Sequence, residues 1–173
     1  MTFSSEPLNK NSAWRNILLP HNLLRGTMRL KTILNYGLKF KCFCIGKSEF
    51  NEKKDSIIVE IKARTNSKPV CSICGTASPG YDTLPERLFE FVPMWGLRVF
   101  FRYAMRRVSC PQCKRVVVEA VPWCDGKNHF TNHYAAFLAS WAKELSWKSV
   151  AAHFHTSWQT VCSAVESVVN YGL

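Results

Sequence analysis

Two Cys-x-x-Cys pairs constrain this chain more than any other feature of its sequence. Cys71 and Cys74 form the first pair, Cys110 and Cys113 form the second, and 35 residues lie between Cys74 and Cys110. Four such sulfurs can bind one metal ion, act as two redox motifs or form two disulfides. Thioredoxin-like chemistry requires the pair at a helix N-terminus within a βαβ unit, whereas a strand pattern precedes each pair here. The spacing therefore favours one closed tetrahedral site for a single structural zinc ion, with no open coordination position for catalysis.

The rest of the sequence favours a cytoplasmic protein, in which thiols stay reduced and disulfides are rare. No apolar run approaches the roughly 20 residues of a membrane helix. The N-terminal stretch "ILLPHNLL" does not have the form of a signal peptide, because it is short, contains Pro20 and lacks a small-residue cleavage site. With 47% hydrophobic and 13% aromatic residues, the chain has enough core-forming side chains to fold.

The charge of the chain is strongly one-sided. The formal net charge is +11, and residues 1–115 carry 20 Lys and Arg against 8 Asp and Glu, whereas residues 116–173 carry 3 against 4. A basic segment of this kind is typical of proteins that bind a polyanion, and nucleic acid is the usual one in the cytoplasm. The alternative is a basic surface that serves only solubility.

Three strands are predicted around the cysteine pairs, at residues 56–64, 97–110 and 115–123. In the second of them, strict alternation places arginines on one face and Val99, Phe101 and other apolar residues on the opposite face. An ordinary solvated strand face would also show this pattern. If the chain binds DNA, the phosphate contacts are expected from six basic residues of this region: Arg98, Arg102, Arg106, Arg107, Lys114 and Arg115.

From Thr131 the apolar period changes to that of helices. A first helix is followed by a short second one that Ser146 caps, then by a tight turn around His155, and then by a third helix that Ser157 caps. This order is the helix-turn-helix plan, in which the start of the last helix contacts bases. The alternative is a three-helix unit that only packs or dimerises. The predicted base contacts are Ser157, Trp158, Gln159, Thr160 and Ser163.

These patterns together predict an α+β chain in which a small β-rich zinc ribbon precedes an all-α helix-turn-helix domain. Residues 1–27 are expected to form a poorly ordered leader, and residues 28–68 a helix and a strand that lead into the ribbon. The ribbon itself is predicted over residues 69–124, with an insertion between its two knuckles. The helix-turn-helix domain is predicted over residues 131–173.

The remaining cysteines are weaker candidates for a metal site. Cys42, Cys44 and Cys162 fall at positions where core packing is the default expectation. A second site built from Cys124, His129 and His133 is an alternative, although the spacing of these three residues is irregular.

The combined motifs resemble the N-terminal half of insertion-sequence transposases of the ISL-three family. The resemblance covers about residues 28–173 in order. It rests on "MRLKTILNYGLKF", "NSKPVCSICG", "PGYDTLPERLFEFVPMWGLRVFFRYAMRRVSCPQC", "VPWCDGKNHFT", "LSWKSVAAHFHTSWQTV" and "VESVVNYGL". The chain departs from the family pattern at Lys114, where knuckles often have glycine, and at Cys124 and His155, where smaller residues are expected. Residues 1–27 lie outside the match, which makes Met28 a candidate natural start.

The resemblance implies a zinc-binding region, a helix-turn-helix that recognises element ends, and a separate ribonuclease-H-like domain that carries an Asp-Asp-Glu metal-binding triad. It assigns zinc binding to the four paired cysteines and base reading to the start of the third helix. Because the acids of this chain are scattered, we expect no catalysis by the chain alone. The implied function is the DNA-binding part of a truncated, nucleoid-associated transposase. Its partners would be the terminal inverted repeats of the element in double-stranded DNA, and full-length transposase or a second copy. The alternatives are a stand-alone repressor of transposition and a zinc-stabilised protein-interaction module.

Overall fold

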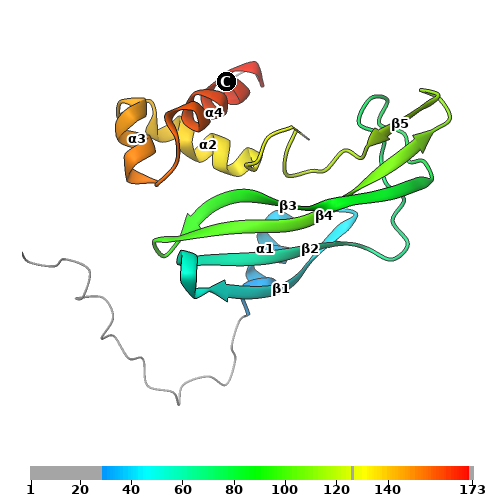
Figure 1. Ribbon diagram of the computed structural model, residues 1–173, viewed down its shortest axis with the longest axis horizontal. Helices are drawn as coiled ribbons and strands as arrows, with labels where there is room; N and C mark the ends of the chain where they lie inside the picture. Colours follow the sequence, from blue (N-terminus) through cyan, green and yellow to red (C-terminus); the bar gives the residue numbers. More distant parts are fainter. Residues whose placement is uncertain (1–28, 126, 172–173) are drawn as a thin grey trace, which may run out of the picture.

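A computed structural model describes residues 29–125 and 127–171 of the 173-residue chain (Figure 1). The predictions made for residues 1–27, a poorly ordered leader and a start at Met28, lie outside the described residues. In chain order the elements are α1 (Leu30–Leu38), β1 (Phe43–Asn51), the 3-10 helix η1 (Glu52–Lys54), β2 (Ser56–Ala63), β3 (Gly80–Met94), β4 (Leu97–Cys110), β5 (Arg115–Val118), α2 (Asn132–Trp141), α3 (Trp147–His153) and α4 (Trp158–Asn170).

The five strands form one mixed sheet in the order β1-β2-β4-β3, and β5 pairs with the C-terminal end of β4, on the edge that faces β2 and beyond the residues that β2 pairs with. The β1–β2, β3–β4 and β4–β5 pairs are antiparallel, whereas β2 and β4 run parallel, with Ser56 opposite Arg98. A parallel pair requires a long crossover connection. Here the crossover contains the first cysteine pair and the whole of β3, so the sheet topology itself places this pair beside the end of β4.

The central strand β4 shows the alternation that its sequence predicts. Val99, Phe101, Tyr103 and Met105 are buried on one face of the sheet, while the residues between them are half-buried on the other. The buried face packs against Leu34 of α1 and against other core residues. The large apolar area removed from water on this face is what holds α1 to the sheet.

Strand β3 is an element that the sequence did not predict, since its residues were assigned to an insertion between the knuckles. Pro85 and Pro93 interrupt it, and its pairing with β4 shifts register between Thr83 and Glu86 and between Phe91 and Met94. Proline cannot donate to a strand ladder and is tolerated on edge strands and at bulges. β3 is an edge strand, and both prolines fall within its register shifts. It therefore pairs with β4 although its sequence is typical of a loop.

The predicted fold class, an α+β chain with a small β-rich zinc ribbon followed by an all-α helix-turn-helix domain, is wrong. The sheet is not a small ribbon, because β1 and β2 extend it through the parallel pairing with β4. The three C-terminal helices follow this sheet and do not form an all-α domain. Glu90 of β3 pairs with Phe130 in a parallel bridge, its backbone N–H donates to the His129 carbonyl at 2.8 Å, and α2 begins from that edge. Sequence periodicity reports only local structure, so it could not show either connection.

The helices themselves lie where the sequence predicts them, and their caps are those expected. The Ser146 hydroxyl accepts from the Ser149 N–H at 3.2 Å, and the Ser157 hydroxyl accepts from the Thr160 N–H at 3.1 Å. Their apolar faces meet in a second core around Leu138. No helix in the described ranges is long and apolar enough to cross a membrane.

Candidate metal centre

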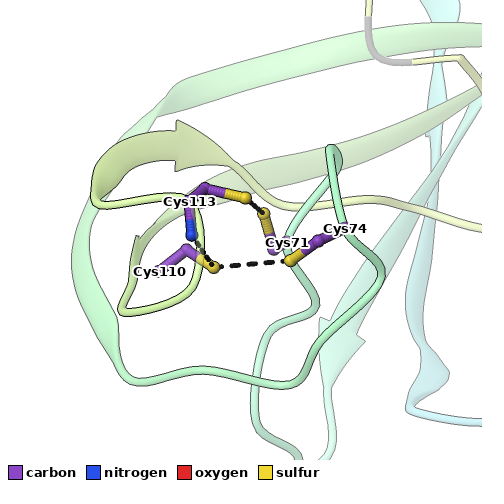
Figure 2. A group of neighbouring side chains, drawn as sticks. All are labelled: Cys71, Cys74, Cys110 and Cys113. Carbon is purple, nitrogen blue, oxygen red and sulfur yellow. Dashed lines mark hydrogen bonds between the residues drawn. The ribbon is translucent and has the colours of Figure 1, made fainter.

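The four predicted zinc ligands come together at one end of the sheet (Figure 2). Cys71 and Cys74 lie in the connection from β2 to β3, Cys110 is the last residue of β4, and Cys113 lies in the turn before β5. Their sulfur atoms all lie within 4.8 Å of one another, with 3.9 Å from Cys71 to Cys113 and 3.4 Å from Cys74 to Cys110. Four sulfurs about 2.3 Å from a tetrahedral metal ion lie about 3.8 Å apart. The cluster therefore has the size of a single four-thiolate metal site.

Each cysteine pair sits on a tight turn that a residue with positive φ closes. Gly75 follows the first pair at φ 71°, and Lys114 follows the second at φ 52°. The Gly75 N–H donates to the Cys71 carbonyl at 3.0 Å, and the Cys113 N–H donates to the sulfur of Cys110 at 3.4 Å. A non-glycine residue in the left-handed region is strained, which explains why glycine is usual at the position of Lys114. Both turns direct two sulfurs toward the same point.

Contacts between the two turns hold the site together apart from the sulfurs. Cys71 forms an isolated antiparallel bridge with Glu119, directly after β5, and the Thr76 hydroxyl donates to the Gln112 side chain at 2.9 Å. The Ala120 N–H donates to the Val70 carbonyl at 2.8 Å. These bonds bring the first turn against the strand that follows the second, so the ligand positions are organised by the sheet.

The surroundings of two thiols in the cluster shift their pKa values in opposite directions. Hydrogen bonds from Thr76 lower the pKa of the Cys74 thiol to about 6. The hydrogen bond with Cys74, together with burial, raises the pKa of Cys113 to about 12. Without a cation, a second thiolate would repel the first within the same few ångströms. A bound divalent cation removes this repulsion, which is why four converging cysteines suit a metal ion better than four free thiols.

Within the described residues, the four cysteines are the only group of three or more potential metal ligands that converge. The alternative site at Cys124, His129 and His133 is not assembled. Cys124 is buried in the main core, and its sulfur lies 3.7 Å from the carbonyl oxygen of Asn128. The ring of His133 packs against that of Phe91, with 5.7 Å between the ring centroids.

Cys42 and Cys44 lie half-buried at the start of β1, and Cys162 lies half-buried in α4, 3.5 Å from a carboxylate oxygen of Glu166. None of the three belongs to the metal cluster.

A buried carboxylate beside the metal site is a feature that the sequence analysis missed. Glu119 is 1% exposed, and its Oε1 accepts from the Tyr103 hydroxyl at 2.6 Å and from the Arg106 backbone N–H at 2.8 Å. Its Oε2 accepts from Nε and Nη2 of Arg106 at 2.9 and 2.7 Å. Burial and the hydrogen bond to Glu119 raise the pKa of Tyr103 well above its usual range, so the phenol remains a donor. A single acid in the apolar run "RVVVEAV" was the signal available in the sequence.

Four of the five arginines predicted to contact phosphates are paired with carboxylates. Nε of Arg98 donates to Glu90 at 2.8 Å, and Arg102 lies 3.6 Å from Glu49 and 3.8 Å from Glu86. Arg106 binds Glu119, and Arg107 binds Asp82. These pairs reduce the positive field of β4.

The other two predicted phosphate contacts, Lys114 and Arg115, are exposed beside the second turn of the metal site. Neither is in an ion pair within the part of the chain that the structure describes.

The exposed cations of α1, β1, η1 and the segments that flank α1 and follow β2 differ from the arginines of β4. We call nine of them the basic surface, because each is exposed and none is in an ion pair among residues 29–125 and 127–171. They are Arg29, Lys31, Lys39, Lys41, Lys47, Lys53, Lys54, Arg64 and Lys68.

A groove of about 550 Å³ between α1 and β1 is lined by Arg29, Lys31, Lys47 and Lys62, with Glu49 as its one acid.

The predicted base contacts lie at the start of α4, in the solvent-exposed first two turns. Trp158 is 52% exposed, Ser157, Gln159 and Ser163 are exposed, and Thr160 is half-buried. The turn before this helix has the geometry expected from its sequence, with His155 in the left-handed region at φ 53°. The structure thus leaves these side chains accessible, and base reading stays a prediction.

We compared the chain with protein-family models, curated proteins and solved structures. No protein-family model, curated protein or solved structure matches the chain at a significant level.

Proposed function

We propose that this chain is a zinc-stabilised module that binds double-stranded DNA and recognises the ends of an insertion element. The observation that carries this proposal is the basic surface, nine exposed cations with no carboxylate partner among the described residues. An unpaired exposed lysine or arginine is free to neutralise a phosphate and release its counterion. An arginine already paired with a carboxylate must first give up that partner. The phosphate contacts are therefore assigned first to the basic surface, and only second to the arginines of β4.

Zinc is the metal that the cluster supports best. Tetrahedral four-sulfur sites in proteins hold zinc or iron, and thiolate ligands disfavour magnesium and calcium. Four thiolates leave no open position, so the ion would organise structure: it would fix the end of β4 against the connection from β2 to β3.

Sequence recognition is assigned to the exposed start of α4. Gln159 is the side chain of this region that can form a bidentate pair with adenine, and Ser157 and Ser163 can donate to or accept from base edges. The resemblance to ISL-three transposases supports the inverted repeats at element ends as the DNA that the chain would bind. In this proposal the chain supplies binding only, and strand cleavage would belong to a separate catalytic domain.

Salt dependence tests the assignment of phosphate contacts. Replacing both Lys31 and Lys47 by glutamine removes two phosphate contacts, so the slope of log affinity against log salt concentration should become shallower by about 1.8. Affinity should be measured for a 20-bp duplex by fluorescence anisotropy at several salt concentrations. The matched control replaces Lys143 and Lys148, two exposed lysines of the helical region, by glutamine. Affinity that does not change with salt, or equal effects of the two double variants, would contradict this function.

A further inference from the structure

The turn between β3 and β4 places a tryptophan where the backbone disfavours it. Met94 pairs with Leu97, so Trp95 and Gly96 form a two-residue hairpin loop. Both have positive φ, 53° at Trp95 and 78° at Gly96, which is the pattern of a type I′ turn. Asparagine, aspartate and glycine are the residues usual at the first of these positions, because a bulky side chain is strained there.

The fold gains little from Trp95 to offset this strain. The residue is 77% exposed, the highest exposure of any tryptophan in the part of the chain described here. Its ring has no aromatic or cation contact among the described residues. Strained residues that the surrounding packing does not explain occur preferentially at functional sites. Trp95 therefore has the features of a side chain that binds a ligand: a strained backbone, high exposure and no ring contact within the described residues.

A second turn, with two exposed lysines, lies at the same end of the sheet as this tryptophan. Because β2 and β4 run parallel, with Ser56 opposite Arg98, the η1 turn lies at the same end of the sheet as the β3–β4 turn (Figure 1). Lys53 and Lys54 of η1 are exposed and belong to the basic surface, and Phe50 just before η1 is 55% exposed. A flat aromatic ring beside cations is the combination that proteins use to hold an unstacked base and its phosphates.

We propose that Trp95 is a base-stacking residue, which receives an unpaired or unstacked base of the nucleic acid held by the basic surface. This inference rests on the proposed DNA-binding function and adds a contact to it. Stacking uses the face of the ring and no hydrogen-bond readout, so the contact is tolerant of base identity. Its contribution is to favour DNA that is locally opened over a regular duplex.

The local charges favour a base over a membrane surface as the ligand of Trp95. Glu52 and Asp55 flank Lys53 and Lys54, so the four residues of this turn carry no net charge. Attraction to an anionic membrane needs a cluster of basic residues next to the apolar anchor. One stacked base needs only one ring and a nearby phosphate contact.

The substitution Trp95→Asn tests this inference and is not expected to destabilise the fold. Asn-Gly is the preferred pair for a type I′ turn, so the variant should melt about 2–4 °C higher than the wild type, because the strain at residue 95 is relieved. The binding assay compares a 20-bp duplex with the same duplex carrying one bulged adenine. The wild-type chain should prefer the bulged DNA by about 5- to 150-fold, the range expected for one stacked base, and the variant should lose this preference but keep its salt slope.

Tyr81→Asn is the matched control, because Tyr81 is 62% exposed and lies at the opposite end of β3. It should leave the preference for bulged DNA unchanged. If the wild-type chain binds DNA with the expected salt slope but shows no preference for the bulge, or if Trp95→Asn retains the preference, the stacking role is refuted and DNA binding is not. If the wild-type chain shows no salt-dependent DNA binding, both proposals fail. Tight binding of anionic lipid vesicles that Trp95→Asn abolishes, with DNA affinity unchanged, would identify a membrane contact and also refute it.

Discussion

Replacing Cys110 by serine is expected to reduce the bound metal, zinc in the proposed function, from one ion per chain to a substoichiometric amount and to unfold the end of the sheet that carries the four cysteines. Cys110 ends β4, and its sulfur lies 3.4 Å from that of Cys74 and accepts from the Cys113 N–H. Structural zinc sites contribute about 10–16 kcal/mol of apparent binding free energy. A typical domain has a free energy of unfolding of only about 5–15 kcal/mol, so losing one ligand should have a very large effect.

The measurements are metal content by mass spectrometry of the native protein and thermal unfolding with and without a chelator. Cys162→Ser is the control, because Cys162 lies in α4 outside the cluster and should leave both the metal content and the melting temperature nearly unchanged. A full complement of zinc in the Cys110→Ser protein would show that Cys110 is not a metal ligand and would contradict the four-cysteine site. A full complement of iron in the wild type would leave the site intact and change the identity of the metal.

The second large effect is expected from Glu119→Gln, a substitution that hardly changes the volume of the side chain. The two oxygens of Glu119 accept from four donors: the Tyr103 hydroxyl and three N–H groups of Arg106. A carboxylate is an acceptor at both oxygens, whereas a carboxamide has one oxygen and one NH₂ group that would face these donors. The Arg106 side chain is only 19% exposed, so the substitution would leave a partly buried charge without its partner. Breaking a buried pair in this way costs about 3–5 kcal/mol.

Urea unfolding of metal-loaded protein measures this loss as a change in the free energy of unfolding. Glu86→Gln is the control, because Glu86 pairs with Arg102 at 3.8 Å through a side chain that is 65% exposed. Exposed pairs of this kind contribute about 0–1 kcal/mol. A loss below about 1 kcal/mol for Glu119→Gln would mean that the buried network does not stabilise the sheet.

The hydrogen-bond network of Glu119, Tyr103 and Arg106 lies next to the four cysteines, so the two substitutions should affect each other. Glu119 forms the backbone bridge to Cys71, so the residue that holds Arg106 also positions a metal ligand. Loss of the metal should therefore loosen the Glu119 network as well. The two substitutions should be less than additive, because sites that share partners are coupled.

The metal site was predictable because its ligands depend on local geometry. Two residues between cysteines allow both sulfurs to point to one side of a tight turn, and this holds wherever the turn lies in the fold. Helix caps at Ser146 and Ser157 and the alternation of β4 were predictable for the same reason. Each depends on residues a few positions apart.

The pairing of the sheet and the charges on it depended on residues far apart in the chain. The prolines of β3 make it read as a loop, and only its position at the edge of the sheet makes them acceptable. The arginines of β4 read as a free basic face, yet each meets a carboxylate that another strand or the segment after β5 brings to it.

The sequence by itself determined the four metal ligands, the helices and the alternating central strand, since short-range sterics and burial decide these. Only the tertiary structure decided that β2 joins β4 in parallel, that Glu119 neutralises Arg106, and that the arginines of β4 are paired while the cations of the basic surface are not. The reason is that ion pairing and strand pairing are set by distances in space, which the order of residues along the chain does not report.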